Sequence, residues 1–438
     1  MKKKLLIIIF VFTTILINNI FIQPLGLDEI WNYGFSYAIR LGEIPYKDFN
    51  MVLTPLYSFI MAIPLIFKNN ILVFHIFHAF LFSCGFYFVY KLINDKAWLL
   101  MILFFIPISI TYSSYNIFLF VLFVVLIYLE KNNRSDYLIG FILGCMILTK
   151  QSVGIMVLIP GILYYIKDKN KVLKRLLGCF IPCLIFLIYL LVTKSFNSFI
   201  DLCFFGLFDF ANKNGNIFNI YFIFSIILNL LTIFFIIKKP KEIYFYYELF
   251  FSSIIIPLYD IYHFQLQLIA FTFICFMYIK KVPLKSFYMF LTVFVCILSL
   301  FIKDGSSRKI IYPNKINHFE YRLLISENLK FTEEVNNYLK ENKDNKYMFL
   351  DSSGYYFRII NDEKVSYLDL INMGNWGYNG SNKLLATIKS LPKNTLFIID
   401  DSELIGQKQV DRNALRYVIK HGRKIKTIKI YDIYVIDK

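Results

Sequence analysis

The sequence predicts an α-helical polytopic membrane protein that ends in a small soluble domain. Of its 438 residues, 58% are hydrophobic, and the mean hydropathy is +0.57. Stretches such as 4–22 and 97–130 are almost free of charge, and about 20 such residues let an α-helix cross a bilayer. After residue 302 the composition becomes that of a soluble chain. We therefore predict a transmembrane domain over 1–302 and an α/β domain over 303–438.

About eleven apolar segments are predicted to be transmembrane helices, with juxtamembrane helices between some of them. The first follows a lysine-rich start without a small-residue cleavage site, so a retained helix is favoured over a cleaved signal peptide. Several are shorter than about 20 residues, so flanking Tyr, Phe and Asn residues must extend them. The segments lie near 4–22, 71–92, 97–112, 117–130, 137–149, 151–166, 176–194, 217–237, 243–259, 263–279 and 284–302.

The charges decide how the apolar segment 53–67 is placed. It has only 15 residues and contains Pro55 and Pro64, so it is short for a crossing and poor as a continuous helix. If it lies at the interface, eighteen Lys and Arg residues of the short loops fall on one side and six on the other. If this segment crossed the membrane, the most basic loop would lie on the external side, against the positive-inside rule. We therefore predict a juxtamembrane helix, a cytoplasmic N-terminus and an extracytoplasmic C-terminal domain in a multi-pass plasma-membrane protein.

The soluble domain is predicted to alternate strands and helices. Alternation favours a layered α/β domain over a hairpin-rich one. The Gly- and Asn-rich loop 372–380 is a candidate for acceptor binding, although turn chemistry explains it as well. Helices are expected over about 318–340 and 382–391, and short strands over 347–351, 355–360, 395–400 and 428–437.

Composition and motifs exclude several classes of function. The net charge of +17 comes mostly from the predicted cytoplasmic border, where basic residues favour anionic lipid head groups, so nucleic acid is not an expected partner. The sequence has no dinucleotide fingerprint, phosphate-binding loop, nucleophile elbow or zinc spacing. Its seven cysteines lie almost entirely in predicted spans and imply no disulfide framework. His75 and His78 lie one helical turn apart but would lack a third metal ligand.

The best candidate for chemistry is a short polar segment after the first span, residues 27–50, which we call the ledge. Apolar residues at helical spacing follow Asp28 and Glu29 as far as Gly42, so the two carboxylates open a surface helix. Taken alone, they are explained by the positive end of the helix dipole. Asp48 follows in the same ledge, where a lipid head group and an external acceptor could meet. This additional carboxylate and the position at the membrane surface favour a catalytic role.

Two stretches, DEIWNYGFSYAIRLGEIPYKDFNMVLTPL (28–56) and LGCMILTKQSVGIMVLIPGILYYI (143–166), resemble the GT-C superfamily of membrane glycosyltransferases. The bacterial RgtA/B/C/D-like and mannosyltransferase-like enzymes are the nearest branch, and protein O-mannosyltransferases are more remote. The resemblance covers about residues 5–280, and its most specific part is the DE pair with GxxPYxDF. It implies a GT-C fold and transfer of a sugar from a polyprenyl-phosphate-linked donor to an extracytoplasmic glycan, lipid or protein. It also implies that Asp28 acts as the base or orients the acceptor, with Glu29 as its catalytic neighbour.

Such a transfer also needs cations or hydrogen-bond donors that stabilise the departing phosphate. Each residue proposed for this role also has an explanation without a substrate: a lysine can snorkel, a histidine can be hydrogen-bonded at the interface, and a tyrosine can belong to the aromatic belt. The residues predict no metal ligands and no cofactor, and a role for a divalent cation stays open. The predicted external side carries the substrate-binding candidates Arg40, Tyr46, Lys47, Asp48, Tyr115, Asn116, Lys150, Gln151 and His263.

Two other classes of function stay open. A polysaccharide polymerase or O-antigen ligase would also use lipid-linked glycans, but its main external loop is expected in the middle of the set of spans. A transporter of lipid-linked glycans would show paired broken helices in two related halves. The sequence shows neither the broken helices nor the related halves of a transporter, and the glycosyltransferase is favoured over both classes.

Cysteine labelling tests the predicted topology. Because the positive-inside pattern places the C-terminal domain outside, Asn345→Cys in a background without native cysteines should react in intact cells with a membrane-impermeant maleimide. Asp168→Cys, in a loop predicted to be cytoplasmic, is the control and should react only after permeabilisation. Labelling of position 345 only from the cytoplasmic side would overturn the topology.

Overall fold

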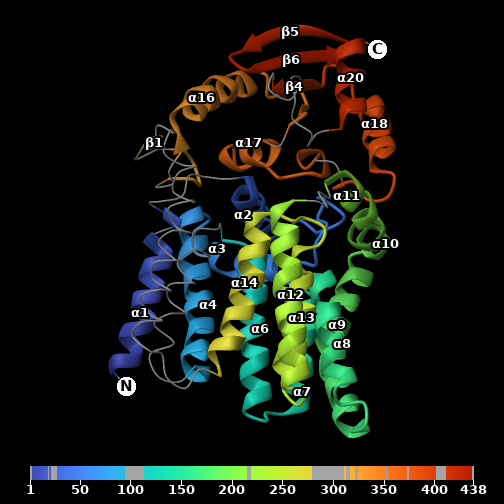
Figure 1. Ribbon diagram of the computed structural model, residues 1–438. Helices are drawn as coiled ribbons and strands as arrows, with labels where there is room; N and C mark the ends of the chain where they lie inside the picture. The colour runs from blue at the N-terminus through green and yellow to red at the C-terminus, as the bar shows by residue number, and fades with distance from the viewer. Residues whose placement is uncertain are drawn as a thin grey trace.

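The computed structural model folds the chain into a bundle of helices with a small α/β domain across one end (Figure 1). The N-terminus lies at the opposite end of the bundle from the C-terminal domain. The structure describes residues 2–17, 19–20, 27–93, 113–214, 219–278, 310–311, 316–320, 324–351, 353–371, 374–400 and 411–436.

Helices occupy the predicted apolar segments that the structure describes. The predicted segments 97–112 and 284–302, and the predicted domain boundary at residue 302, lie outside the described residues. That every helix crosses a bilayer stays a prediction. The bundle comprises α1 (Lys2–Ile17), α4 (Ile71–Leu92), α6 (Tyr115–Lys131), α7 (Asp136–Ile147), α8 (Gln151–Leu163), α9 (Lys169–Val192), α12 (Ile220–Lys238), α13 (Ile243–Phe251) with the turn η3 (Ser252–Ile255), and α14 (Ile261–Phe276).

Three of the described helices, α4, α9 and α12, are long and apolar enough to cross a membrane. Two of them expose large apolar side chains to the surroundings: Ile185 on α9 is 64% exposed, and Leu230 and Ile237 on α12 are 60% and 70% exposed. Large exposed apolar surface is unfavourable in water and fits a lipid environment. These helices therefore support a membrane location.

The ledge and its neighbours join the bundle to the C-terminal domain. The ledge begins with α2 (Leu27–Arg40), which ends just before Gly42, a residue at φ +84°. The predicted juxtamembrane segment 53–67 contains only the ten-residue helix α3 (Leu56–Leu65), which packs against α2. The short helices α10 (Phe196–Ile200), η2 (Asp201–Phe205, a π-helical turn) and α11 (Gly206–Asn214) lie beneath the C-terminal domain (Figure 1).

The C-terminal domain is built on a four-stranded sheet in the order β3-β4-β6-β5, in which β3 and β4 are parallel and the other neighbours antiparallel. A separate two-stranded sheet pairs β1 (Ile310–Ile311) with β2 (Leu324–Ile325). The remaining elements are α16 (Ser326–Glu341), β3 (Tyr347–Phe349), α17 (Gly354–Ile360), η4 (Tyr367–Asp369), α18 (Gly380–Ser390), β4 (Leu396–Asp400), α20 (Arg412–His421), β5 (Gly422–Ile428) and β6 (Tyr431–Ile436).

Three predictions for this domain were wrong. The predicted strand 355–360 is the helix α17; most of its side chains are buried, so its sequence shows no helical polar face. The helix expected from residue 318 begins at Ser326, because Leu324 and Ile325 pair with β1 as the strand β2, and His318 has φ +64°. The helix α20 and most of β5 were not predicted; β5 is an edge strand with largely exposed polar residues.

Glycines let α7 and α9 pack with their backbones in close approach. A Cβ atom at Gly140 would lie 2.0 Å from the Arg175 carbonyl oxygen, and one at Gly178 would lie 2.1 Å from the Tyr137 carbonyl oxygen. At the same end, the buried Arg175 guanidinium bonds Glu130, with 2.6 Å between Nη1 and Oε1. Any larger residue at either glycine must push the helices apart.

Gly140→Ala should lower the free energy of unfolding by about 1–3 kcal/mol, because overpacking a tight interior forces the backbone to shift. Thermal unfolding of the purified protein in detergent measures the change. Gly161→Ala is the matched control: its Cβ would first meet the flexible tip of Leu143 at 3.1 Å, so it should cost less. Equal melting temperatures for wild type and Gly140→Ala would show that the two helices pack less closely than described.

Candidate functional site

The two carboxylates that open α2 point to different surroundings. Asp28 is exposed, and its carboxyl has no hydrogen-bond partner among the described residues. Glu29 is fully buried, and its Oε1 lies 2.7 Å from Nε2 of His75 on α4. His75 Nδ1 in turn lies 2.8 Å from the Ser113 hydroxyl, which accepts a bond from Asn19 at 3.2 Å. Asp28 is therefore available for chemistry, whereas Glu29 is committed to holding α2 against the bundle.

Asp28 is surrounded by protein although solvent reaches it. Desolvation by the surrounding atoms raises the pKa of its carboxyl above the ordinary value, with a smaller contribution from the charge of Asp260. The charge of His263 opposes this rise. Asp260 and His263 both belong to the start of α14, so the fold brings the first turn of α2 close to the first turn of α14.

A directional chain of hydrogen bonds lies beside Asp28. Lys150 Nζ donates to Asn116 Oδ1 at 3.2 Å, and Asn116 Nδ2 lies 3.5 Å from His263 Nε2. His263 Nδ1 lies 2.9 Å from each carboxylate oxygen of Asp260. A carboxylate only accepts, so Nδ1 donates to Asp260, and in the neutral form of the ring Nε2 accepts from Asn116. In that form the chain runs in one donor direction from a buried ammonium to a carboxylate.

Helix ends position every member of this chain. Asn116 lies in the first turn of α6, Lys150 is the residue before α8, and Asp260 caps α14 by accepting a bond from the His263 backbone N–H at 2.9 Å. These ends face the C-terminal domain (Figure 1). The bonds and charge of His263 outweigh burial, which acts in the opposite direction, and lower the pKa of Asp260.

Lys150 is the buried cation of the site. It is 7% exposed, and its Nζ also lies 3.4 Å from the Ile254 carbonyl oxygen and 5.8 Å from the centre of the Tyr115 ring. An ammonium has three N–H donors, and the described acceptors use two of them. Its position against the ring also allows a cation–π contact. The sequence predicted Tyr115, Asn116, Lys150 and His263 as binding residues, and the structure brings them together; it adds Asp260, which sequence reasoning missed although it lies three residues before His263.

The other predicted binding residues lie in different surroundings. Gln151 bonds backbone on both sides, donating to Val52 and Cys203 at 2.9 and 3.0 Å. Tyr46 donates to the Leu53 carbonyl at 2.6 Å, and Asp48 accepts from the Ile44 N–H at 2.7 Å. These three side chains shape the ledge. Arg40 and Lys47 are exposed on it.

The arrangement offers an exposed carboxyl, a buried ammonium and an oriented imidazole at one end of the bundle. Such groups can accept a proton from a hydroxyl and stabilise an anion. Within the described ranges, no group of three or more His, Cys, Asp and Glu residues could hold a metal ion. No protein-family model, curated protein or solved structure matches this chain. The functional argument therefore rests on the residues and their geometry.

Substitutions of the adjacent carboxylates Asp28 and Glu29 are predicted to have different effects on stability, because their surroundings differ. Glu29→Ala should lower the free energy of unfolding by about 3 kcal/mol, because it leaves the buried His75 without its carboxylate. Asp28→Asn should change it by less than about 0.5 kcal/mol, since no described partner is lost. Denaturant unfolding in mixed micelles measures both. Similar values for the two variants would contradict the assignment of Glu29 as the structural carboxylate.

Proposed function

We propose that this chain is a GT-C-like membrane glycosyltransferase that moves a sugar from a polyprenyl-phosphate donor to an extracytoplasmic glycan, lipid or protein. The observation that carries the proposal is the exposed carboxyl of Asp28 beside the chain from Lys150 to Asp260. A base and an anion-stabilising cation are the two groups that such a transfer requires.

In the proposed reaction, the Asp28 carboxylate takes the proton of the acceptor hydroxyl as its oxygen attacks the anomeric carbon of the sugar. The bond between that carbon and the phosphate oxygen breaks, and polyprenyl phosphate leaves with the electron pair. Lys150, close to His263 through Asn116, supplies the positive charge that stabilises the leaving phosphate. Glu29 acts indirectly, because its bond to His75 fixes the helix that carries Asp28.

The membrane arrangement belongs to the same proposal. We place eleven spans in the plasma membrane, with the ledge, the Lys150 chain and the C-terminal domain on the extracytoplasmic side. The position of the polar chain at helix ends supports a transferase over a transporter, whose site is expected near the bilayer midplane between repeats. An acceptor outside the cell would reach Asp28 from the side of the C-terminal domain.

Substitution of Asp28 tests the proposed base. Asp28→Asn keeps the size of the side chain but removes its charge, so transfer from a radiolabelled polyprenyl-phosphate sugar in membranes should fall by about 100-fold or more. Because desolvation by the surrounding protein raises the pKa of Asp28, the wild-type rate should already decline at a pH above the range of an ordinary carboxyl as the medium is acidified.

Lys150→Ala should mainly weaken donor binding, because a charge-assisted contact to phosphate is worth about 1.5–3 kcal/mol. The KM for the donor should rise more than kcat falls. Glu341→Gln, an exposed change on the C-terminal domain, is the control and should behave as wild type.

Wild-type transfer by Asp28→Asn would remove the catalytic assignment and leave that carboxylate as a partner of the helix dipole.

A further inference from the structure

The C-terminal domain rests directly on the ledge. Its helix α17 lies over α2 (Figure 1), so close that a Cβ atom at Gly34 would lie 2.4 Å from the Tyr355 ring. The following loop, residues 361–369, bonds the ledge twice: the Glu363 carbonyl accepts from the Tyr37 hydroxyl at 3.2 Å, and the Tyr367 carbonyl accepts from Asn50 at 3.2 Å. These contacts form a docking interface between two parts of the chain.

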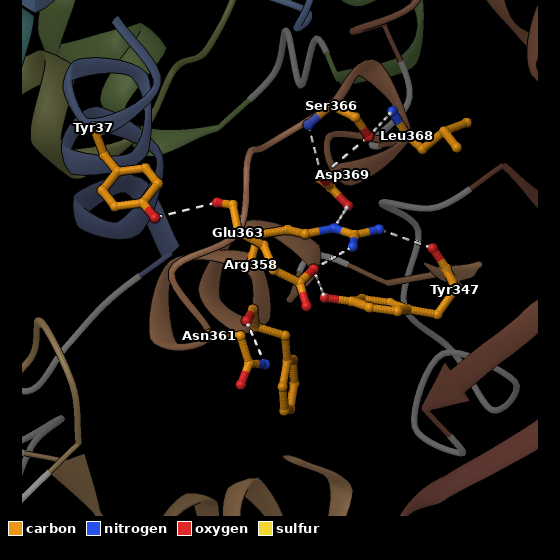
Figure 2. A network of polar contacts seen from close by, with 9 residues as sticks. Tyr37, Tyr347, Arg358, Asn361, Glu363, Ser366, Leu368 and Asp369 are labelled. Carbon is orange, nitrogen blue, oxygen red and sulfur yellow. Dashed lines mark hydrogen bonds and ion pairs between the residues drawn. The ribbon is translucent and has the colours of Figure 1, made fainter. Parts of the chain in front are cut away.

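Arg358 keeps the loop 361–369 in one shape (Figure 2). Its guanidinium lies 2.5 Å from Glu363 Oε2 and 3.2 Å from Asp369 Oδ1, and it donates to the Tyr347 carbonyl at 3.0 Å. Asp369 also accepts from the Ser366 backbone N–H at 2.7 Å. The charges of Arg358, Glu363 and Asp369, on the domain side of the interface, are therefore paired with one another.

Glu43, on the ledge side, is the exception. It follows Gly42 at the end of α2, is only 7% exposed, and accepts a backbone hydrogen bond from Val365 of the docked loop. Its second oxygen, Oε2, has no hydrogen-bond partner among the described residues, and the buried Tyr355 hydroxyl also lacks one. A buried carboxylate with an unpaired oxygen is costly, whereas the neutral acid is tolerated.

Charges on both sides of the interface surround Glu43. From the ledge comes Asp48; from the docked loop come Asp369 and the exposed Lys364. Burial raises the pKa of the Tyr37 and Tyr355 phenols, and the charge of the nearby Glu43 adds to the rise in each. The two acidic neighbours disfavour a charged Glu43, and the one lysine favours it.

We propose that Glu43 is a proton-operated latch, which keeps the C-terminal domain docked on the ledge while it is protonated and loosens the domain when it ionises. The latch concerns contact between two parts of the chain, so it goes beyond the proposed transfer reaction and does not depend on it.

The direction of the pH effect follows from the surroundings of Glu43. Desolvation, aided by Asp48 and Asp369 and opposed by Lys364 and the Val365 N–H, raises the pKa of Glu43 from 4.5 to about 7 in the docked state. Docking is thus strongest below about pH 4.5 and weakens as the pH rises towards 7. Above that range Glu43 is ionised in both states, and the effect levels off. The docking equilibrium should fall by at most about tenfold per pH unit within the window.

Hydrogen exchange of the full-length protein in detergent micelles tests the latch. The readout is exchange in α2 and in the segment 354–369 at pH 5 and pH 8, corrected for the intrinsic rate at each pH. In the wild type, opening of this interface should increase at least tenfold between the two pH values. Glu43→Gln, which stays neutral, should remain protected at both. Glu341→Gln, an exposed carboxyl away from the interface, should behave as wild type.

Lys364→Gln provides the second variant. It removes the cation that favours the ionised form, so it should shift the loss of protection to higher pH. Protection of α4 and α6 in each variant reports whether the bundle is intact. A wild type without pH dependence, a Glu43→Gln variant that keeps the wild-type dependence, or an unchanged midpoint in Lys364→Gln would each overturn the latch.

Discussion

The buried contact between Glu29 and His75 is the constraint on which the rest of the site depends. It ties the first turn of α2 to α4 at 2.7 Å, inside a chain of polar contacts that reaches Ser113 and Asn19. Successive residues of a helix project about 100° apart, so once Glu29 faces α4, Asp28 must face elsewhere. That direction brings Asp28 within electrostatic reach of Asp260 and His263. One buried pair therefore decides which of two adjacent carboxylates can meet a substrate.

The ledge gains its shape from both of its neighbours. Residues 32–38 of α2 are all buried, because the bundle covers one side of the helix and the C-terminal domain the other. Tyr33 packs edge-on against Phe74 of α4 and against Phe319, with ring centres 5.7 Å apart in each case, and Phe35 packs against Tyr355 at the same distance. A fourteen-residue helix is marginal on its own in water, so burial on two sides supplies most of its stability. The position of Asp28 therefore depends on the docked domain as well as on the bundle.

The sequence was informative where one physical property dominates. Apolar length located the bundle helices that the structure describes, and loop charge predicted which helix ends share a side. Asn116, Lys150 and His263, far apart in sequence, are therefore grouped by the sequence alone. It failed where partners come from distant segments. The carbonyls of Val52 and Cys203, which occupy Gln151, cannot be found from local spacing, and neither can the burial of Glu29 against His75. The sequence of α17 predicts a strand, because burial on nearly all sides removes the polar face that marks a helical period.

The two ends of the ledge place opposite demands on pH. On the proposed function, Asp28 must be ionised to accept a proton, and the raised pKa of its carboxyl moves that requirement towards higher pH. On the proposed latch, Glu43 must be protonated to keep the domain docked, and its pKa of about 7 moves undocking in the same direction. The same helix, α2, leads from one group to the other. At low pH the docked ledge is stable, but the base Asp28 loses its charge. At high pH Asp28 is ionised, but the contact that fixes its helix is weaker. The pH range in which both conditions are met is therefore bounded on each side by a different carboxyl of the same short segment.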